Sequence, residues 1–128
     1  MEKTEGPDGL NEVVLRGRVS GDPVERTLPT GSTLVSFRVV LPRQRTTMTA
    51  GSKAVSDWIE CSAWGARVRQ QAARWRAGDQ VEVRGSLRRR FFRAAGQSRS
   101  SVEVEVLAGR LLRRADGSGR ESRRAATG

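Results

Sequence analysis

Aromatic rings and arginines share faces of two predicted β-strands. Residues 56–64 alternate, and Trp58 and Trp64 fall on the outward side, where polar side chains are usual. Flat rings can stack on unpaired bases, and guanidinium groups can pair with phosphates. The pattern predicts a surface that binds single-stranded nucleic acid without sequence preference. Its candidate residues are Trp58, Trp64, Phe92, Arg84, Arg88, Arg90, Arg38 and Arg99.

Each of these assignments has a structural alternative. The two tryptophans would also suit packing beneath a long loop or burial in a subunit interface, and the arginines would also suit a solvated face. GC-rich codon usage is a further explanation of the arginine excess. Phe91 lies on the opposite face of its predicted strand from Phe92, so its ring is predicted to cap the core. Trp75 completes the apolar stripe of a predicted helix, and Cys61 is expected to be a small buried hydrophobe.

Composition favours a binding protein over an enzyme. The 128 residues carry 24 Lys and Arg against 14 Asp and Glu, a formal charge of +10, which suits a polyanionic partner. The chain has no histidine and one cysteine, so the commonest proton shuttle and metal ligands are missing. Its carboxylates do not have the spacing of a metal site. We therefore expect no catalysis, no cofactor and no metal.

Hydrophobic periodicity predicts short strands with one helix between the third and fourth. Two outward glutamates on the last strand, Glu103 and Glu105, would repel phosphate, so that surface is expected to face solvent or a partner strand. This order matches the OB-fold, an all-β five-stranded Greek-key barrel with one short helix. The predicted strands are 13–19 with an extension at 24–28 beyond a break at Asp22 and Pro23, 32–41, 56–64, 81–92 and 102–106; the helix is 66–76, a long loop spans 42–55 and a hairpin tip lies at 94–98.

The chain is divided into one domain and two tails. Residues 1–10 are expected to be a flexible lead-in, 11–112 the OB-fold domain that binds single-stranded DNA, and 113–128 a disordered basic tail. No apolar run is long enough to span a membrane, and residues 1–10 have neither a basic start nor a hydrophobic stretch. We therefore expect a cytoplasmic, nucleoid-associated protein with no membrane partner.

Several short motifs occur in the order and spacing of one known family. Between Asn11 and Leu107 the sequence resembles the bacterial single-stranded DNA-binding (SSB) proteins. The matching segments are NEVVLRGRV from Asn11, GDPV from Gly21, PTG from Pro29, SDW from Ser56, WG from Trp64, AGDQV from Ala77, GSLR from Gly85 and GQSR from Gly96.

The resemblance implies an OB-fold, a homo-oligomer with a tetramer favoured over a dimer, and stacking aromatics at Trp58, Trp64 and Phe92. It implies binding and protection of single-stranded DNA in replication, recombination or repair, and leaves RNA open as a second ligand. The chain departs from the family pattern because it lacks an acidic C-terminal tip, so it resembles a short, atypical member. The alternative is a dimeric primosomal adaptor-type OB protein that acts mainly through protein contacts.

Overall fold

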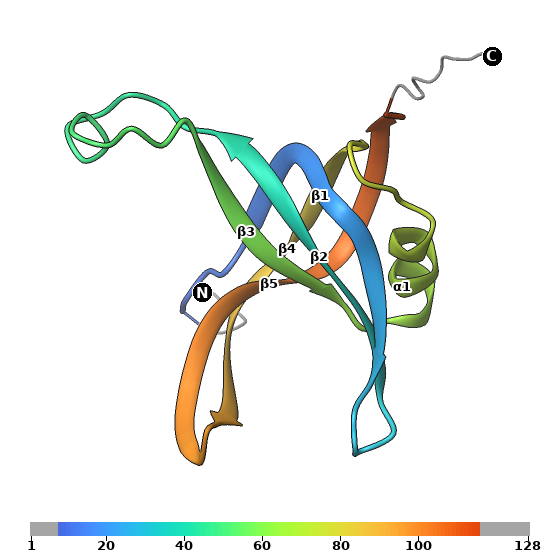
Figure 1. Cartoon of the computed structure of the whole chain (residues 1–128). Helices are drawn as coiled ribbons and strands as arrows, with labels where there is room; N and C mark the ends of the chain where they lie inside the picture. The colour runs from blue at the N-terminus through green and yellow to red at the C-terminus, as the bar shows by residue number, and fades with distance from the viewer. Residues whose placement is uncertain (1–7, 116–128) are drawn as a thin grey trace.

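The computed structural model describes residues 8–115, whose strands close into one barrel (Figure 1). The strands neighbour one another in the order β1-β2-β3-β5-β4; β3 and β5 run parallel and the other neighbours antiparallel. The predicted five-stranded barrel with one short helix is confirmed. Its elements are β1 (Val13–Thr27), β2 (Thr33–Pro42), β3 (Ser56–Ala63), α1 (Ala66–Ala73), β4 (Gln80–Ala94) and β5 (Gln97–Arg113).

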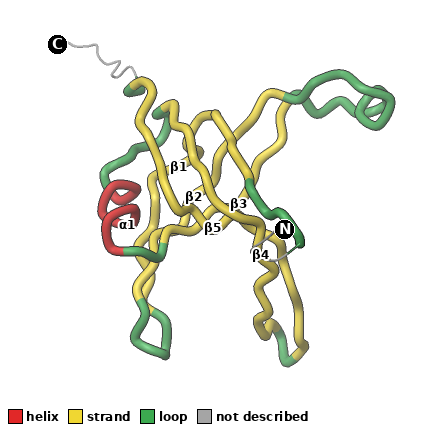
Figure 2. Tube along the Cα trace, turned by 180° about the vertical axis from the view of Figure 1, so that it is seen from behind, coloured by secondary structure: helices red, strands yellow, loops and turns green. Residues whose placement is uncertain are grey.

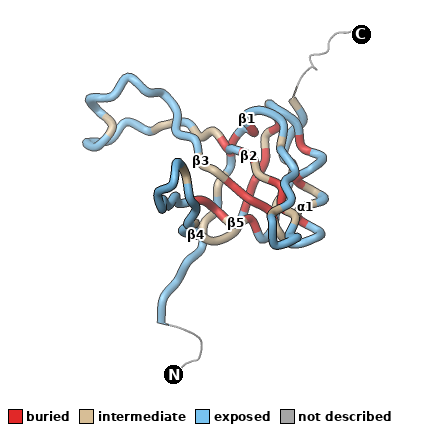
Figure 3. The backbone as a smooth tube through the Cα atoms, turned by 60° about the horizontal axis from the view of Figure 1, so that its bottom comes forward, coloured by how far each residue is buried: buried red, intermediate tan, exposed pale blue. Residues whose placement is uncertain are grey.

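The core forms because alternate residues of each strand face inward. On β2 these residues are Val35, Phe37 and Val39, which are almost completely buried. Figure 2 shows α1 beside the barrel, and just after the helix the ring of Trp75 packs edge-on against Phe37, with ring centroids 5.4 Å apart. The structural assignment of Trp75 is confirmed. Buried residues concentrate in the barrel, whereas the projecting loop and hairpin are exposed (Figure 3).

Three elements differ clearly from the prediction, and the largest difference is in the last strand, which was expected at 102–106 but runs over Gln97–Arg113. The first strand does not break at Asp22 and Pro23 but runs from 13 to 27, with its register against β2 shifting between Ser20 and Val24. Such a shift is a bulge, which lets one strand bend around a small barrel. The helix ends at Ala73, three residues earlier than predicted.

The structure describes three residues beyond 112, the predicted end of the domain. The strand β5 continues to Arg113, and the next two residues are held by buried Asp79. The carboxylate of Asp79 accepts hydrogen bonds from Arg114 Nη1 at 3.1 Å and from the backbone nitrogen of Ala115 at 2.9 Å. Residues 1–7 of the predicted lead-in and 116–128 of the predicted tail lie outside the described residues.

The strands β4 and β5 extend beyond the barrel as a long hairpin (Figure 1). Ala95 and Gly96 both have positive φ, 53° and 78°, as a two-residue hairpin turn of the primed type requires, so the predicted tip is confirmed. Where the strands are still part of the barrel, Gly85 lies very close to β5. A Cβ added at Gly85 would come within 1.8 Å of the backbone oxygen of Glu105.

Glu82 lies beneath three arginines on the outside of the barrel. Its carboxylate is 2.6 Å from Arg110 Nη2, 3.1 Å from Arg84 Nη2 and 3.4 Å from Arg16 Nε. Arg16 and Arg110 are its direct partners on the two neighbouring strands, so the sheet register places them there. The hydrogen bond from Arg110, together with the positive charge of the three guanidinium groups, holds the pKa of Glu82 below its ordinary value of 4.5.

We expect Glu82→Gln to destabilise the protein at neutral pH and to matter less in acid. Because the folded-state pKa is lowered, ionised Glu82 stabilises the fold above pH 4.5, and this contribution disappears as the pH falls through the folded-state pKa. Thermal unfolding of both proteins between pH 7 and 3 should show a gap in Tm that closes below about pH 4.5. The exposed Glu25→Gln is the control and should show no gap. A gap that is independent of pH would contradict the assignment.

Candidate nucleic-acid interface

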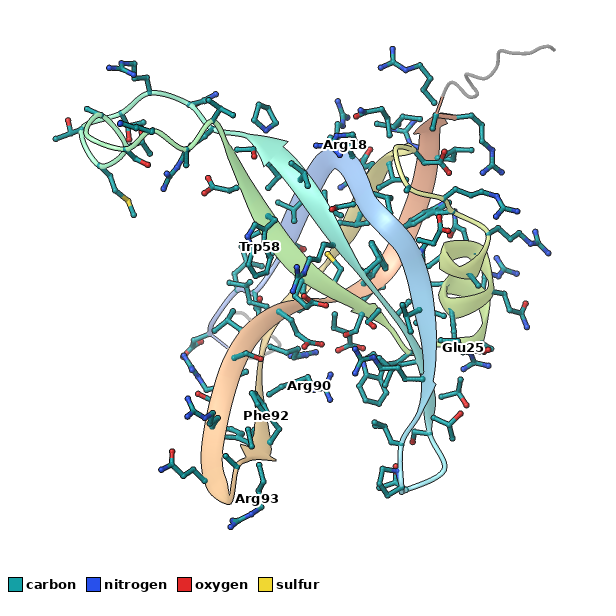
Figure 4. All side chains as sticks on the ribbon, viewed as in Figure 1. Arg18, Glu25, Trp58, Arg90, Phe92 and Arg93 are labelled. Carbon is teal, nitrogen blue, oxygen red and sulfur yellow. The ribbon has the colours of Figure 1, made fainter. Side chains whose placement is uncertain are left out.

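A groove crosses the outside of the barrel and continues onto the hairpin. It has a volume of about 590 Å³ and brings together Arg38 of β2, Trp58 of β3, and Arg90 and Phe92 of β4. Trp58 is 57% exposed and Phe92 is 43% exposed, so both rings are accessible. Figure 4 shows Trp58 on β3, with Arg90 and Phe92 on the part of β4 that belongs to the hairpin. Four of the predicted site residues therefore share one surface.

The position of Trp58 follows from the pairing of β2 with β3. Arg38 faces Glu60 across the two strands, and Val40 faces Trp58. The guanidinium carbon of Arg38 lies 4.2 Å from the centroid of the Trp58 ring, while Arg38 Nε donates a hydrogen bond to Glu60 Oε1 at 3.0 Å. Arg38 therefore contacts the indole by a cation–π interaction and still leaves more than half of it exposed.

Trp64 lines an adjoining hollow and is held by a hydrogen-bond network. Its Nε1 donates to Ser62 Oγ at 2.9 Å, and Ser62 Oγ donates to Glu103 Oε2 at 2.5 Å. The guanidinium carbon of Arg90 lies 5.9 Å from the Trp64 ring centroid. Trp64 is only half-buried, so it combines a fixed orientation with a partly open ring.

Carboxylates neutralise much of the arginine charge at this surface. Arg88 Nε lies 2.9 Å from Glu105 Oε1, and Arg90 Nη1 lies 3.5 Å from Glu103 Oε1. Of the two alternatives expected for Glu103, solvent is wrong, because its side chain is buried against Ser62 of β3 and Arg90 of β4. The larger groove is lined by three arginines and two glutamates, so its net charge is only +1. The exposed aromatic surface of this groove is therefore a more distinctive feature than its net charge.

Three predicted arginines lie outside the groove, and one of them, Arg88, lines the adjoining hollow with Trp64. Arg84 belongs to the cluster around Glu82 and lines a separate hollow with Ala108 and Arg110. Arg99 is the strand partner of Phe92 in the hairpin but does not line the groove. The prediction grouped Arg84 with Arg88 and Arg90 only because all three alternate onto the same side of the strand. The barrel curves away between residues 84 and 90, beyond the bulge at Gly85.

Sequence reasoning missed several polar residues of the groove. Ser36 lies two residues before Arg38 on the same face of β2, and Ser101 is the strand partner of Arg90, so their outward position could have identified both. Arg26 belongs to β1, where it pairs with Leu34 of the neighbouring β2. Alternation along the two ring-bearing strands therefore does not identify it.

The structure contradicts the prediction for Phe91 and confirms the prediction for Cys61. Phe91 does not cap the core, because the hairpin has left the barrel at this position and the ring is 77% exposed. Cys61 is fully buried, as predicted. Burial, with smaller contributions from the negative charges of Glu60 and Glu103, raises the pKa of its thiol to about 12. The thiol is therefore protonated at neutral pH and is not a nucleophile.

Two other kinds of feature are absent between residues 8 and 115. No group of three or more acidic, histidine or cysteine side chains in this part of the chain could hold a metal ion. Likewise, no helix among the described residues has the length and apolar character needed to cross a membrane.

A closed five-stranded barrel with exposed rings and arginines along one groove is typical of OB-fold proteins that bind oligonucleotides. The profile of the Single-strand binding protein family matches residues 10–112, so the chain belongs to this family. A single-stranded DNA-binding protein of Aquifex aeolicus is 30% identical over 108 residues, which cover 84% of this chain and 74% of the relative.

A second relative agrees with this assignment, and a solved structure agrees with the fold. A single-stranded DNA-binding protein of Treponema pallidum is 32% identical over 109 residues, covering 80% of this chain but only 58% of that relative. Among solved structures, a Plasmodium falciparum SSB in complex with ssDNA superposes with a TM-score of 0.66 at 23% identity, covering 85% of this chain and 98% of that one. At this identity the superposition supports the fold alone.

Proposed function

We propose that this protein binds single-stranded DNA without sequence preference and protects it during replication, recombination or repair, in the cytoplasm at the nucleoid. The observation that carries the proposal is the groove in which Trp58 and Phe92 expose their rings beside Arg38 and Arg90. Membership of the single-strand binding protein family supports it. The strand is bound and released unchanged, so the role requires no catalysis.

Stacking on the two exposed rings supplies most of the affinity. Each base stacked on an aromatic side chain contributes roughly 1–3 kcal/mol, and every base has a flat face, so this contribution does not depend on sequence. Arg38 already lies over the indole of Trp58 at 4.2 Å. A base that stacks on the open part of this ring brings its phosphate close to the same guanidinium group.

The arginines contact phosphates either while they remain paired with a glutamate or after they have left it. Arg38 pairs with Glu60 at 3.0 Å, and both side chains are partly exposed. A phosphate can therefore pair with Arg38 nitrogens that do not contact Glu60. Release of counterions from the strand then makes binding weaker at high salt, with a slope of about 0.7 per phosphate contact.

Titration with oligo-dT under tryptophan fluorescence tests the proposal. Stacking on Trp58 should quench its emission, and the affinity should fall as salt is raised. Oligo-rU should be measured in parallel, because RNA offers the same stacking faces and phosphates. Absence of both quenching and salt-dependent affinity for oligo-dT would contradict the proposed function.

We expect Glu60→Gln to strengthen binding of oligo-dT. The substitution removes the carboxylate that competes with phosphate for Arg38 and raises the charge of the groove. An exposed ion pair is worth about 0.2–1 kcal/mol, so the gain should be about 1.5- to 5-fold at low salt. Glu25→Gln, which removes the same charge from an exposed position outside the groove, is the matched control for overall charge. Equal gains in both variants would contradict a local effect at Arg38.

We also propose a homo-oligomer, with a tetramer favoured over a dimer. The strand β1 pairs with β4 over 13–18 but with β2 only from Arg18 onward, so among the described strands none pairs with the other edge of residues 13–17. An open edge can pair with another chain, and exposed Val14 and Leu107 line a hollow beside it. Sedimentation equilibrium should give about four times 14.1 kDa. A dimer with feeble strand affinity would favour a protein adaptor instead.

A further inference from the structure

The exposed hairpin carries rings and arginines on both of its faces. Along β4, Arg90 and Phe92 belong to the face that lines the groove. The residues between and beside them, Arg89, Phe91 and Arg93, alternate onto the opposite face, here called the reverse face. Each face therefore has a phenylalanine with arginine at strand spacing.

The reverse face continues the inner face of the barrel. Val83 is fully buried in the core, but by Phe91 the hairpin has left the barrel and the ring is 77% exposed. The cross-strand neighbours of the reverse-face residues are Val102, Ser100 and Ser98. Figure 4 shows Arg93 at the hairpin tip, far from the barrel. Nothing in the described part of the chain covers the Phe91 ring.

The charge of the reverse face differs from that of the groove. Glu103 is the only acidic residue between 87 and 104, and its side chain faces Arg90 on the groove side. Arg89 donates to Ser100 Oγ at 3.1 Å and Arg93 donates to the backbone oxygen of Gly96 at 2.9 Å. Neither arginine forms an ion pair with any residue between 8 and 115. The reverse face therefore suits an anionic occupant better than the groove does.

We propose that the reverse face is a second contact for the same single strand, in which bases stack on Phe91 and phosphates pair with Arg89 and Arg93. This inference rests on the function proposed above. A strand that leaves the groove at Phe92 passes over the edge of the hairpin and continues on the reverse face. The complementarity of two arginines without acidic partners and an exposed ring identifies the occupant as single-stranded nucleic acid.

Oligonucleotide length separates the two faces experimentally. One OB-fold contacts roughly 4–16 nucleotides, so oligo-dT of about 8 nucleotides fills the groove and one of about 30 also covers the hairpin. We expect Phe91→Leu, which keeps an apolar side chain but removes the π-face, to weaken binding of the long strand by about 10-fold and leave the short strand unchanged. Phe92→Leu is the matched variant and should weaken both lengths.

The outcomes distinguish this inference from the proposed function. If Phe91→Leu leaves the long strand unchanged while Phe92→Leu weakens it, the reverse face is not a contact and the proposed function stands. Equal loss on both lengths would contradict a path around the hairpin. A lower solution mass for Phe91→Leu would assign the face to a subunit interface and overturn the inference. If neither variant changes the affinity for either length, the hairpin does not bind the strand and the stacking role proposed for Phe92 is wrong.

The arginines give an independent measurement. The double variant Arg89→Gln with Arg93→Gln should reduce the salt slope for the long strand by about 0.7 per lost phosphate contact and leave the slope for the short strand unchanged. Equal slopes for the variant and the parent protein on the long strand would overturn the assignment of these two arginines.

Discussion

Replacing Trp58 by leucine is expected to weaken binding of oligo-dT by about 5- to 100-fold and to remove most of the fluorescence quenching. The indole is 57% exposed in the groove, and leucine offers no flat face for a base. The loss of Trp58 also leaves Arg38 without its cation–π partner at 4.2 Å. Affinity measured by fluorescence anisotropy of labelled oligo-dT does not depend on tryptophan emission and tests the expectation directly.

Two ring-preserving variants complete this experiment. Trp58→Phe retains a stacking face and should keep most of the affinity while losing the quenching signal. Trp64→Phe removes a half-buried tryptophan next to the groove and should keep the quenching. Leucine and phenylalanine variants of Trp58 that bind equally well would show that packing rather than stacking explains the exposed ring.

The second large effect concerns stability. Gly85→Ala is expected to destabilise the barrel by about 3 kcal/mol or more, because overpacking against backbone cannot be relieved by a side-chain rotation. The added Cβ would lie 1.8 Å from the backbone oxygen of Glu105, so β4 and β5 must separate. Urea denaturation followed by circular dichroism measures the change in the free energy of unfolding.

Gly51→Ala is the matched control for the glycine substitution. Gly51 lies in the projecting loop with nothing within 4 Å of an added Cβ, and its φ is not positive. This variant should be neutral or slightly stabilising, because alanine restricts the unfolded chain. Equal stabilities for the two variants would show that β4 and β5 tolerate a wider separation than the structure indicates.

The sequence predicts the fold well because the strands are strongly alternating. Val35, Phe37 and Val39 identify the inner face of β2, and Gly96, whose φ is positive, marks a hairpin turn. These signals are local and depend on the chemistry of single residues. Closure of the barrel, by contrast, joins β3 to β5 across more than 30 residues and has no local signature.

The candidate site is only partly predictable for the same reason. Parity places Trp58 and Phe92 correctly on the outer surface, but it cannot tell where a strand leaves the barrel. Phe91 has the parity of a core residue and is nevertheless exposed, because the hairpin extends beyond the last inward layer. Alternation along a strand also does not predict ion pairs, so only the structure reveals that Glu103 is buried beneath Arg90.

The glutamates beside the groove arginines have a consequence for how a strand leaves. When Arg38 releases a phosphate, a carboxylate oxygen of Glu60 is already 3.0 Å away, so the cation is not left unpaired. Each contact can therefore break separately at low cost, and neighbouring contacts can form again before the whole strand departs. We expect short residence times and movement along the strand, so that a polymerase or a complementary strand can displace the protein stepwise.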